Sequence, residues 1–126
     1  MADNKKIQKQ KVIVATFYQS KTGAKPVLDW LKSKVLSDAD RQVIGSDMQM
    51  VEYGWPVGRP LVGSMKGGLW EVRSTLPSKR ETRVFFGVEK GRMVLVHAII
   101  KKTQATPDDE LDLARERWAD WKKANP

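Results

Sequence analysis

Cationic side chains recur in three β-prone runs that lie between residues 69 and 101. Arg73 lies in the first run, Arg83 lies in the second, and His97 and Lys101 lie in the third. Successive residues of a strand face opposite sides of a sheet, so His97 and Lys101 share one face. If the register of the strands cooperates, all four side chains meet on one surface.

These residue types point to chemistry on a phosphate group. The planar guanidinium of arginine binds two phosphate oxygens at once, and fixed cations can stabilise charge on the equatorial oxygens without a metal. Attack of a ribose 2′-OH on the neighbouring phosphorus would leave a 2′,3′-cyclic phosphate and a 5′-OH. His97 is the candidate proton shuttle, because histidine titrates close to neutral pH. Glu71 could replace it as the base, or simply orient Arg73.

The same residues also have structural interpretations, and the sequence leaves both open. An arginine on a sheet face is commonly solvated, and a histidine between Leu95 and Ile99 is commonly a packed, partly buried residue. The pair Lys101–Lys102 at a strand end can serve to discourage edge pairing. Trp55, which falls in a loop, could stack on a base or belong to the core.

Other catalytic chemistries find little support in the composition. The 126 residues include one histidine and no cysteine, which leaves few ligands for zinc or a transition metal and excludes disulfides and thiolate catalysis. The acidic run Asp108–Glu110 is typical of a helix start. Residues 61–68 do not match a phosphate loop, because the Gly-Lys-Ser/Thr ending is missing. We therefore expect no metal and no cofactor.

The charge distribution favours a polyanionic partner. The net charge is +8 at pH 7, and residues 59–106 hold ten basic and three acidic side chains. Such an excess is typical of proteins that bind nucleic acid. No run approaches the ~20 apolar residues that span a bilayer, and the first ten residues lack the apolar segment of a secretory signal. We expect a cytoplasmic protein that does not bind a membrane.

A strand and a first helix are expected to open the fold. Residues 11–18 are β-branched and aromatic, which predicts a strand. A helix should follow from Pro26, because proline suits the first helical turn. Its apolar positions are Leu28, Leu31 and Val35, at helical spacing.

A second helix is expected directly afterwards. Ser37 and Asp40 have the spacing of a capping box for a helix over Asp38–Tyr53. Its apolar stripe should run through Val43 and Met50, flanked by Ile44 and Val51. Two helices joined by a tight break predict a helical hairpin.

The second half of the chain predicts a loop, a meander and a last helix. Residues 55–68 are rich in glycine and proline and should be largely loop. The runs 69–76, 81–88 and 92–101 are separated by short breaks that suit antiparallel hairpins. Thr106 should cap the last helix, with Pro107 at its first position. The apolar face of that helix holds Leu111, Ala114, Trp118 and Trp121.

This order of elements predicts an α+β fold in a single domain over residues 1–126. An N-terminal strand and a helical hairpin should pack on a mainly antiparallel, curved sheet, with a C-terminal helix. Residues 1–10 are polar and are expected to be frayed.

Three segments and the end of the last helix form a combined motif. The segments are Gly68–Arg73 (GLWEVR), Arg83–Phe86 (RVFF) and His97–Pro107 (HAIIKKTQATP), followed by an Ala-x-x-Arg ending at Ala114–Arg117. Taken together they resemble the phage-derived, HigB-like branch of the RelE/ParE toxin superfamily. The resemblance runs from about Val12 to Trp118, which is nearly the whole chain. No one of these segments would be enough alone.

The resemblance implies a RelE-like fold and the toxin of a type II toxin–antitoxin module, which a helix-turn-helix antitoxin neutralises. HigB- and RelE-type members cleave mRNA, typically on the translating ribosome, and basic residues of their sheet hold the RNA backbone. Transferred by motif, the expected catalytic residues are Arg73, Arg83, His97 and Lys101. The expected RNA contacts are Lys66, Arg80, Lys102 and Glu71.

Two other functions fit the same scaffold. ParE-type members act on DNA gyrase rather than on RNA, and a non-catalytic RNA-binding phage accessory protein would also carry a basic sheet. Where RelE has lysines in the first meander strand, this chain has Trp70 and Glu71. It also lacks the late tyrosine of some relatives, so the identity of the general base stays open.

Overall fold

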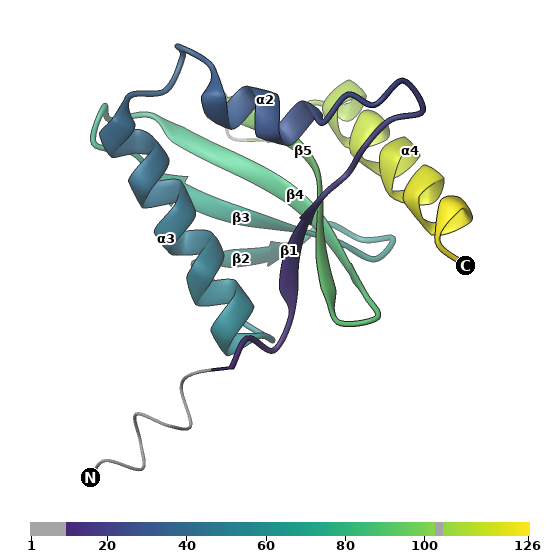
Figure 1. Cartoon of the computed structure of the whole chain (residues 1–126). Helices are drawn as coiled ribbons and strands as arrows, with labels where there is room; N and C mark the ends of the chain where they lie inside the picture. The colour runs from purple at the N-terminus through teal and green to yellow at the C-terminus, as the bar shows by residue number, and fades with distance from the viewer. Residues whose placement is uncertain (1–9, 103–104) are drawn as a thin grey trace, which may run out of the picture.

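A five-stranded mixed sheet with helices on both faces forms the fold of the computed structural model, which describes residues 10–102 and 105–126 (Figure 1). Its strand order is β1-β5-β4-β3-β2; β1 runs parallel to β5 and all other neighbours are antiparallel. The prediction of an α+β fold with a mainly antiparallel sheet is therefore confirmed. In chain order the elements are β1 (Val14–Phe17), α2 (Pro26–Lys32), α3 (Asp38–Gly54), β2 (Val62–Ser64), β3 (Leu69–Thr75), β4 (Glu81–Glu89), β5 (Arg92–Lys101) and α4 (Asp108–Ala124).

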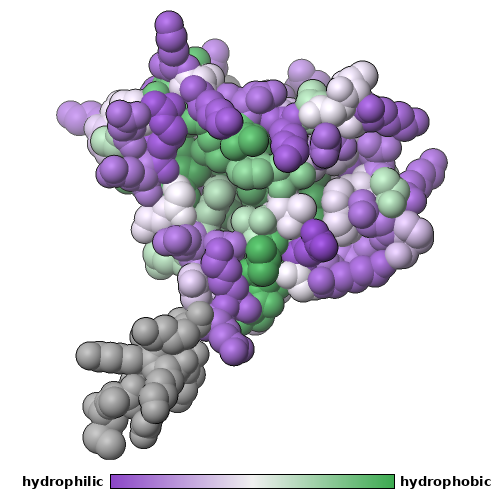
Figure 2. Space-filling view, in the orientation of Figure 1, coloured by the Kyte–Doolittle hydropathy of each residue, from purple (hydrophilic) through white to green (hydrophobic). Residues whose placement is uncertain are grey.

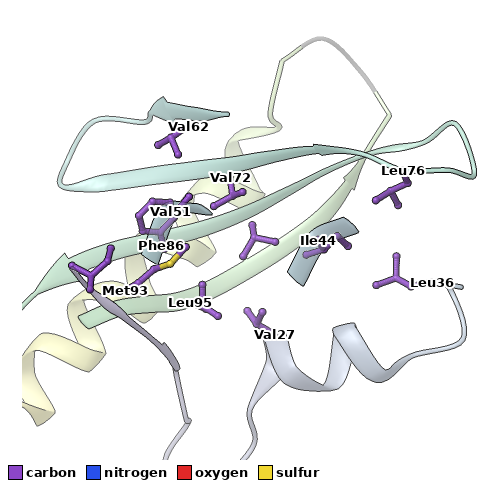
Figure 3. Packing of buried hydrophobic residues seen from close by; sticks show 12 residues of the cluster. Val27, Leu36, Ile44, Val51, Val62, Val72, Leu76, Phe86, Met93 and Leu95 are labelled. Atoms are coloured by element: carbon purple, nitrogen blue, oxygen red, sulfur yellow. The ribbon is translucent and has the colours of Figure 1, made fainter. Parts of the chain in front are cut away.

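Helices α2 and α3 cover one face of the sheet and build the larger core with it. Figure 3 shows Val27 of α2 and Ile44 and Val51 of α3 in one cluster with Val72 and Phe86 of the sheet. All five side chains are almost fully buried. Branched and aromatic side chains of alternate strand positions thus meet one stripe of each helix.

The predicted apolar stripes of both helices are confirmed in part, since Leu31 of α2 and Val43 of α3 pack against the larger core as expected. On α2 the buried position is Val27 rather than Leu28, and Val35 lies beyond the helix and is exposed. On α3 the buried positions are Ile44 and Val51, whereas Met50 is 58% exposed. Spacing alone could not choose between adjacent apolar residues, because the orientation of each helix is set by its packing on the sheet.

The start of α3 is fixed as its sequence predicts. The Ser37 hydroxyl accepts from the Asp40 N–H at 3.0 Å, and the Asp40 carboxylate accepts from the Ser37 N–H at 3.1 Å, which completes a capping box. Burial alone would raise the pKa of Asp40. The N–H and hydroxyl donors of Ser37 and Ser78 outweigh that effect and hold the pKa below its usual value.

Two boundaries differ from the sequence predictions. Residues 62–64 were expected in a loop but form strand β2, because they pair with β3. The local sequence pattern does not predict this tertiary contact. Helix α4 begins after Pro107, which is itself the N-cap residue, and no side chain caps it. Thr106 is therefore not the cap, and the acidic first turn of α4 compensates its helix dipole instead.

Helix α4 covers the opposite face of the sheet, as its apolar positions predict. Ala114, Trp118 and Trp121 are buried in a second core, and Leu111 packs against it. The Trp118 indole lies directly on the backbone of Gly87 in β4, where a Cβ atom would come within 2.5 Å of the ring. No helix in the described part of the chain is long and apolar enough to cross a membrane.

We expect Gly87→Ala to destabilise the protein by about 1–3 kcal/mol, because the new methyl group would overpack the contact with Trp118. Gly45→Ala is the matched control. Gly45 lies inside α3 with open space around its Cα, so alanine should stabilise the helix by roughly 0.5–1 kcal/mol. Urea unfolding of both variants followed by circular dichroism measures the difference. Equal stability of the two variants would contradict the close packing of α4 on Gly87.

Candidate functional site

The register of the sheet places the four predicted catalytic residues on one face. Arg73 of β3 stands opposite Arg83 of β4, and Arg83 stands opposite Ile99 of β5. Two residues further along these strands, Glu81 of β4 stands opposite Lys101 of β5. The shared face inferred from strand alternation is confirmed, and it is the face that α4 covers in part.

A β-bulge in β5 brings His97 onto this face. Leu95 pairs with Phe86 and His97 pairs with Phe85, so Val96 is an extra residue on β5. Leu95 belongs to the core under α2 and α3, whereas the His97 ring stacks on Phe85 on the side of α4. In regular alternation His97 would follow Leu95 into the first core. The bulge therefore decides on which side the imidazole lies.

The buried carboxylate of Glu71 joins the two arginines. Its Oε2 accepts from Arg73 Nε at 2.8 Å, and its Oε1 lies 3.5 Å from Arg83 Nε. Glu71 is almost fully buried. It compensates two cations that would otherwise repel each other across neighbouring strands.

Arg73 and Arg83 open onto a pocket of about 380 Å³ at the β3 edge of the sheet. A Cβ atom on Gly63 of β2 would approach the Arg73 Nη2 atom to 2.7 Å, so this glycine leaves the space in which the guanidinium lies. The residues that line the pocket are Asp47, Pro60, Leu61, Arg73, Thr75, Glu81 and Arg83.

The two arginines differ in what they can offer a ligand. Arg83 was expected on the solvent side, but it is 6% exposed and bonded to Glu81 and to the Thr82 carbonyl. The Arg73 side chain is 31% exposed, and among the described residues only its Nε is bonded. The two terminal nitrogens of Arg73 can therefore bind a phosphate, whereas the buried Arg83 side chain forms part of the pocket wall.

Both ring nitrogens of His97 are already bonded to α4. Arg117 approaches Nδ1 at 3.2 Å, and Glu110 Oε1 lies 2.8 Å from Nε2. Because arginine only donates, Nδ1 must accept and Nε2 carries the proton that Glu110 binds. Arg117 also donates to the Val96 carbonyl at 2.9 Å, at the bulge. The imidazole is thus engaged between strand and helix rather than open to a substrate.

The lysines at the end of β5 line a second pocket, of about 310 Å³, between β5 and the start of α4. Lys101 is half-buried and shares the face of Arg83, whereas Lys102 follows the strand and is exposed. This pocket lies across β4 from the arginine pocket.

Two predicted RNA contacts lie elsewhere. Arg80 donates to the Val35 carbonyl at 2.6 Å and to Asp40 at 3.1 Å, so it ties the β3–β4 turn to the start of α3. Lys66 lies in the β2–β3 turn, at the end of β3 remote from the arginines, with φ at 64°. The Trp55 ring packs edge-on against Trp70 and Phe86, which decides for the core and against base stacking.

Sequence reasoning did not single out Gly63, Glu81, Glu110 or Arg117 as parts of the site. Glu81 could have been found, because it alternates with Arg83 on the same strand. The other three reach the site from β2 and α4, and only the packing of these elements brings them there. No group of three or more potential metal-binding side chains was found within residues 10–102 and 105–126.

The arrangement of strands and helices is that of a RelE-like α+β protein. Residues 29–119 match the family model described as phage-derived protein, Gp49-like. The chain therefore belongs to the Gp49-like family, which is a RelE-like, toxin-like family. No curated protein matches the chain at a significant level.

We expect Glu71→Gln to lower the free energy of unfolding by about 1–3 kcal/mol, because a buried charge pair loses one partner and two arginines are left face to face. Glu81→Gln is the matched control, since it removes the same charge from a side chain that is 52% exposed and should cost under about 1 kcal/mol. Urea denaturation at neutral pH compares the two. Equal losses of unfolding free energy would show that the Glu71 carboxylate does not stabilise the Arg73–Arg83 pair.

Proposed function

We propose that this chain is the toxin of a type II toxin–antitoxin module and that it cleaves mRNA at a phosphate bound by Arg73. The main support for the proposal is the Arg73 side chain, which is 31% exposed and lines an open pocket. A buried carboxylate binds its Nε, and its other nitrogens have no partner among the described residues. Such a fork fits two oxygens of one phosphate. Membership of a toxin-like family supports the proposed toxin function, and the net charge of +8 supports binding to RNA.

The cleavage chemistry would use side chains around that phosphate. Arg73 binds its non-bridging oxygens and Arg83 adds positive charge from below. Glu81, which lines the pocket and is 52% exposed, is the best-placed carboxylate to accept the proton of the 2′-OH. Lys101, opposite Glu81 in the register, can return a proton to the departing 5′-oxygen. The products are a 2′,3′-cyclic phosphate and a 5′-OH, and no metal enters a step.

Within the toxin superfamily, we propose that the chain belongs to the HigB-like branch and that it cleaves mRNA on the translating ribosome. The three segments around Arg73, Arg83 and His97 support the branch, and two of them supply the arginine pocket. An RNA held by few contacts gains its geometry from the ribosome, which is consistent with a pocket that offers a single open arginine.

The partner we propose is a helix-turn-helix antitoxin. Figure 2 shows hydrophobic surface between α2 and α3 and along β1, on a face that is otherwise largely hydrophilic. Val12, Met50 and Tyr53 are among the exposed large hydrophobic residues, and a bond from the Val12 N–H to the Glu52 carbonyl places the chain before β1 beside the end of α3. Exposed apolar groups of this kind suit a protein partner.

We expect Arg73→Ala to abolish growth inhibition after induction in cells, and Arg73→Lys to restore little of it, because lysine lacks the bidentate fork. Arg92→Ala is the control, since it removes an exposed cation at the far end of β5. Mapping of mRNA 5′ ends should show discrete cuts within translated codons for the native protein and the control. The rate of cutting should fall at least about 100-fold for Arg73→Ala.

Two outcomes would count against this function. Growth arrest with uncut mRNA and gyrase-dependent DNA breaks would indicate the ParE-like activity. RNA binding without growth arrest or cleavage would indicate a non-catalytic RNA-binding protein.

A further inference from the structure

The pocket at the end of β5 has a different character from the arginine pocket. Its volume is about 310 Å³, and its walls are mainly aliphatic side chains and a proline ring, with lysines at the rim and one carboxylate. The lining residues are Ile99, Ile100, Lys101, Lys102, Ala105, Pro107 and Glu110.

This pocket lies within about two nucleotides of the phosphate that Arg73 would bind. Arg73, Arg83 and Ile99 stand on one rung of three neighbouring strands. Strands lie about 4.8 Å apart, so the Cα atoms of Arg73 and Ile99 are roughly 10 Å apart. The Arg73 guanidinium lies beside Gly63 of β2, on the side of β3 that faces away from Ile99. An RNA whose phosphate rests on Arg73 can therefore place a nearby base beside Ile99.

The chemistry of the pocket suits a base and not a second phosphate. Glu110 would repel a phosphate, whereas a base presents a flat apolar face to Ile99 and Pro107 and hydrogen-bonding groups at its edge. A carboxylate accepts from amino and imino N–H groups, as it does from the amino group of cytosine. The lysines at the rim can follow the RNA backbone.

Glu110 is held in one orientation for such a contact. Its Oε1 accepts from His97 Nε2 at 2.8 Å, and the ring is fixed in turn by Arg117 at Nδ1. The Glu110 Oε2 has no hydrogen-bond partner among the described residues, and the side chain is 35% exposed. One carboxylate oxygen is therefore anchored and the other is available to a ligand.

We infer that Glu110 selects a base near the cleaved phosphate, in favour of adenine, cytosine and guanine and against uracil. The first three carry an exocyclic amino group that donates to the carboxylate. The single N–H of the uracil edge lies between two carbonyl oxygens, which the carboxylate repels. His97 is then a positioning residue that acts through Glu110. This inference rests on the proposed RNA-cleaving function and names the specificity of that site.

The test is binding of short RNAs whose 2′-OH groups are replaced by hydrogen, so that no cleavage occurs. An all-uridine pentamer is compared by fluorescence anisotropy with pentamers that carry one adenosine, cytidine or guanosine at each position in turn. At one position the native protein should bind the substituted RNAs about tenfold more tightly, the effect of one charge-assisted hydrogen bond.

Three variants separate the contributions. Glu110→Gln should reduce the tenfold preference to about twofold or less, because the amide also offers N–H donors to the uracil carbonyls. His97→Gln should reduce it in the same direction. Asp112→Asn removes an equal charge from an exposed position of α4 and should keep the full preference. Circular dichroism confirms that each variant is folded.

Arg73→Ala distinguishes the failure of this inference from failure of the proposed function. It should weaken binding of all the RNAs alike, because it removes the phosphate contact. If the native protein binds RNA through Arg73 but shows no preference that Glu110→Gln alters, base selection is overturned and phosphate binding stands. If the native protein binds none of the RNAs, the proposed function and the inference fail together.

Discussion

Two arginine side chains, Arg73 and Arg83, stand directly opposite each other on neighbouring strands, where like charges repel. The structure tolerates this pair because Glu71 is buried between them, 2.8 Å from Arg73 Nε and 3.5 Å from Arg83 Nε. The carboxylate also fixes which guanidinium atoms face outward. Since Nε of Arg73 is engaged, its terminal nitrogens are left for a phosphate, and Gly63 leaves room for them. The candidate site depends on this one compensated charge.

The face that carries the arginines is divided by α4. At one end the Trp118 indole lies on Gly87 and closes a second hydrophobic core. Towards the other end the helix meets the sheet through polar contacts, in which His97 binds Glu110 and Arg117. One pocket lies beside this polar contact, between β5 and the start of α4, and the arginine pocket lies at the β3 edge of the sheet. Tyr18 adds a further tie to α4, since its hydroxyl donates to Asp120 at 2.6 Å, a bond that raises the pKa of Tyr18.

The net charge of the chain says less about the site than the partners of each cation do. Arg80 serves the start of α3, Arg83 is buried, and Arg117 holds the bulge. These three arginines are bound in structural contacts, although Arg83 still lines the arginine pocket. The more exposed cations of the two pockets are Arg73, Lys101 and Lys102. A count of basic residues could point to a polyanion, but only the bonding of each guanidinium shows which of them a phosphate could reach.

Much of the fold follows from the sequence alone, because its signals are local. The Ser37–Asp40 capping box, the alternation in β3 and β4 and the apolar face of α4 each depend on residues within one or two turns or strands. The same alternation assigns Arg73, Arg83 and Lys101 to one side of their own strands, and the register brings those sides together. Tertiary structure decided what depends on distant partners. Strand β2 exists through pairing with β3, the bulge at Val96 sets the side of His97, and α4 supplies Glu110 and Arg117. Sequence spacing carries no information on such contacts, since they join segments whose relative positions are fixed only when the cores pack.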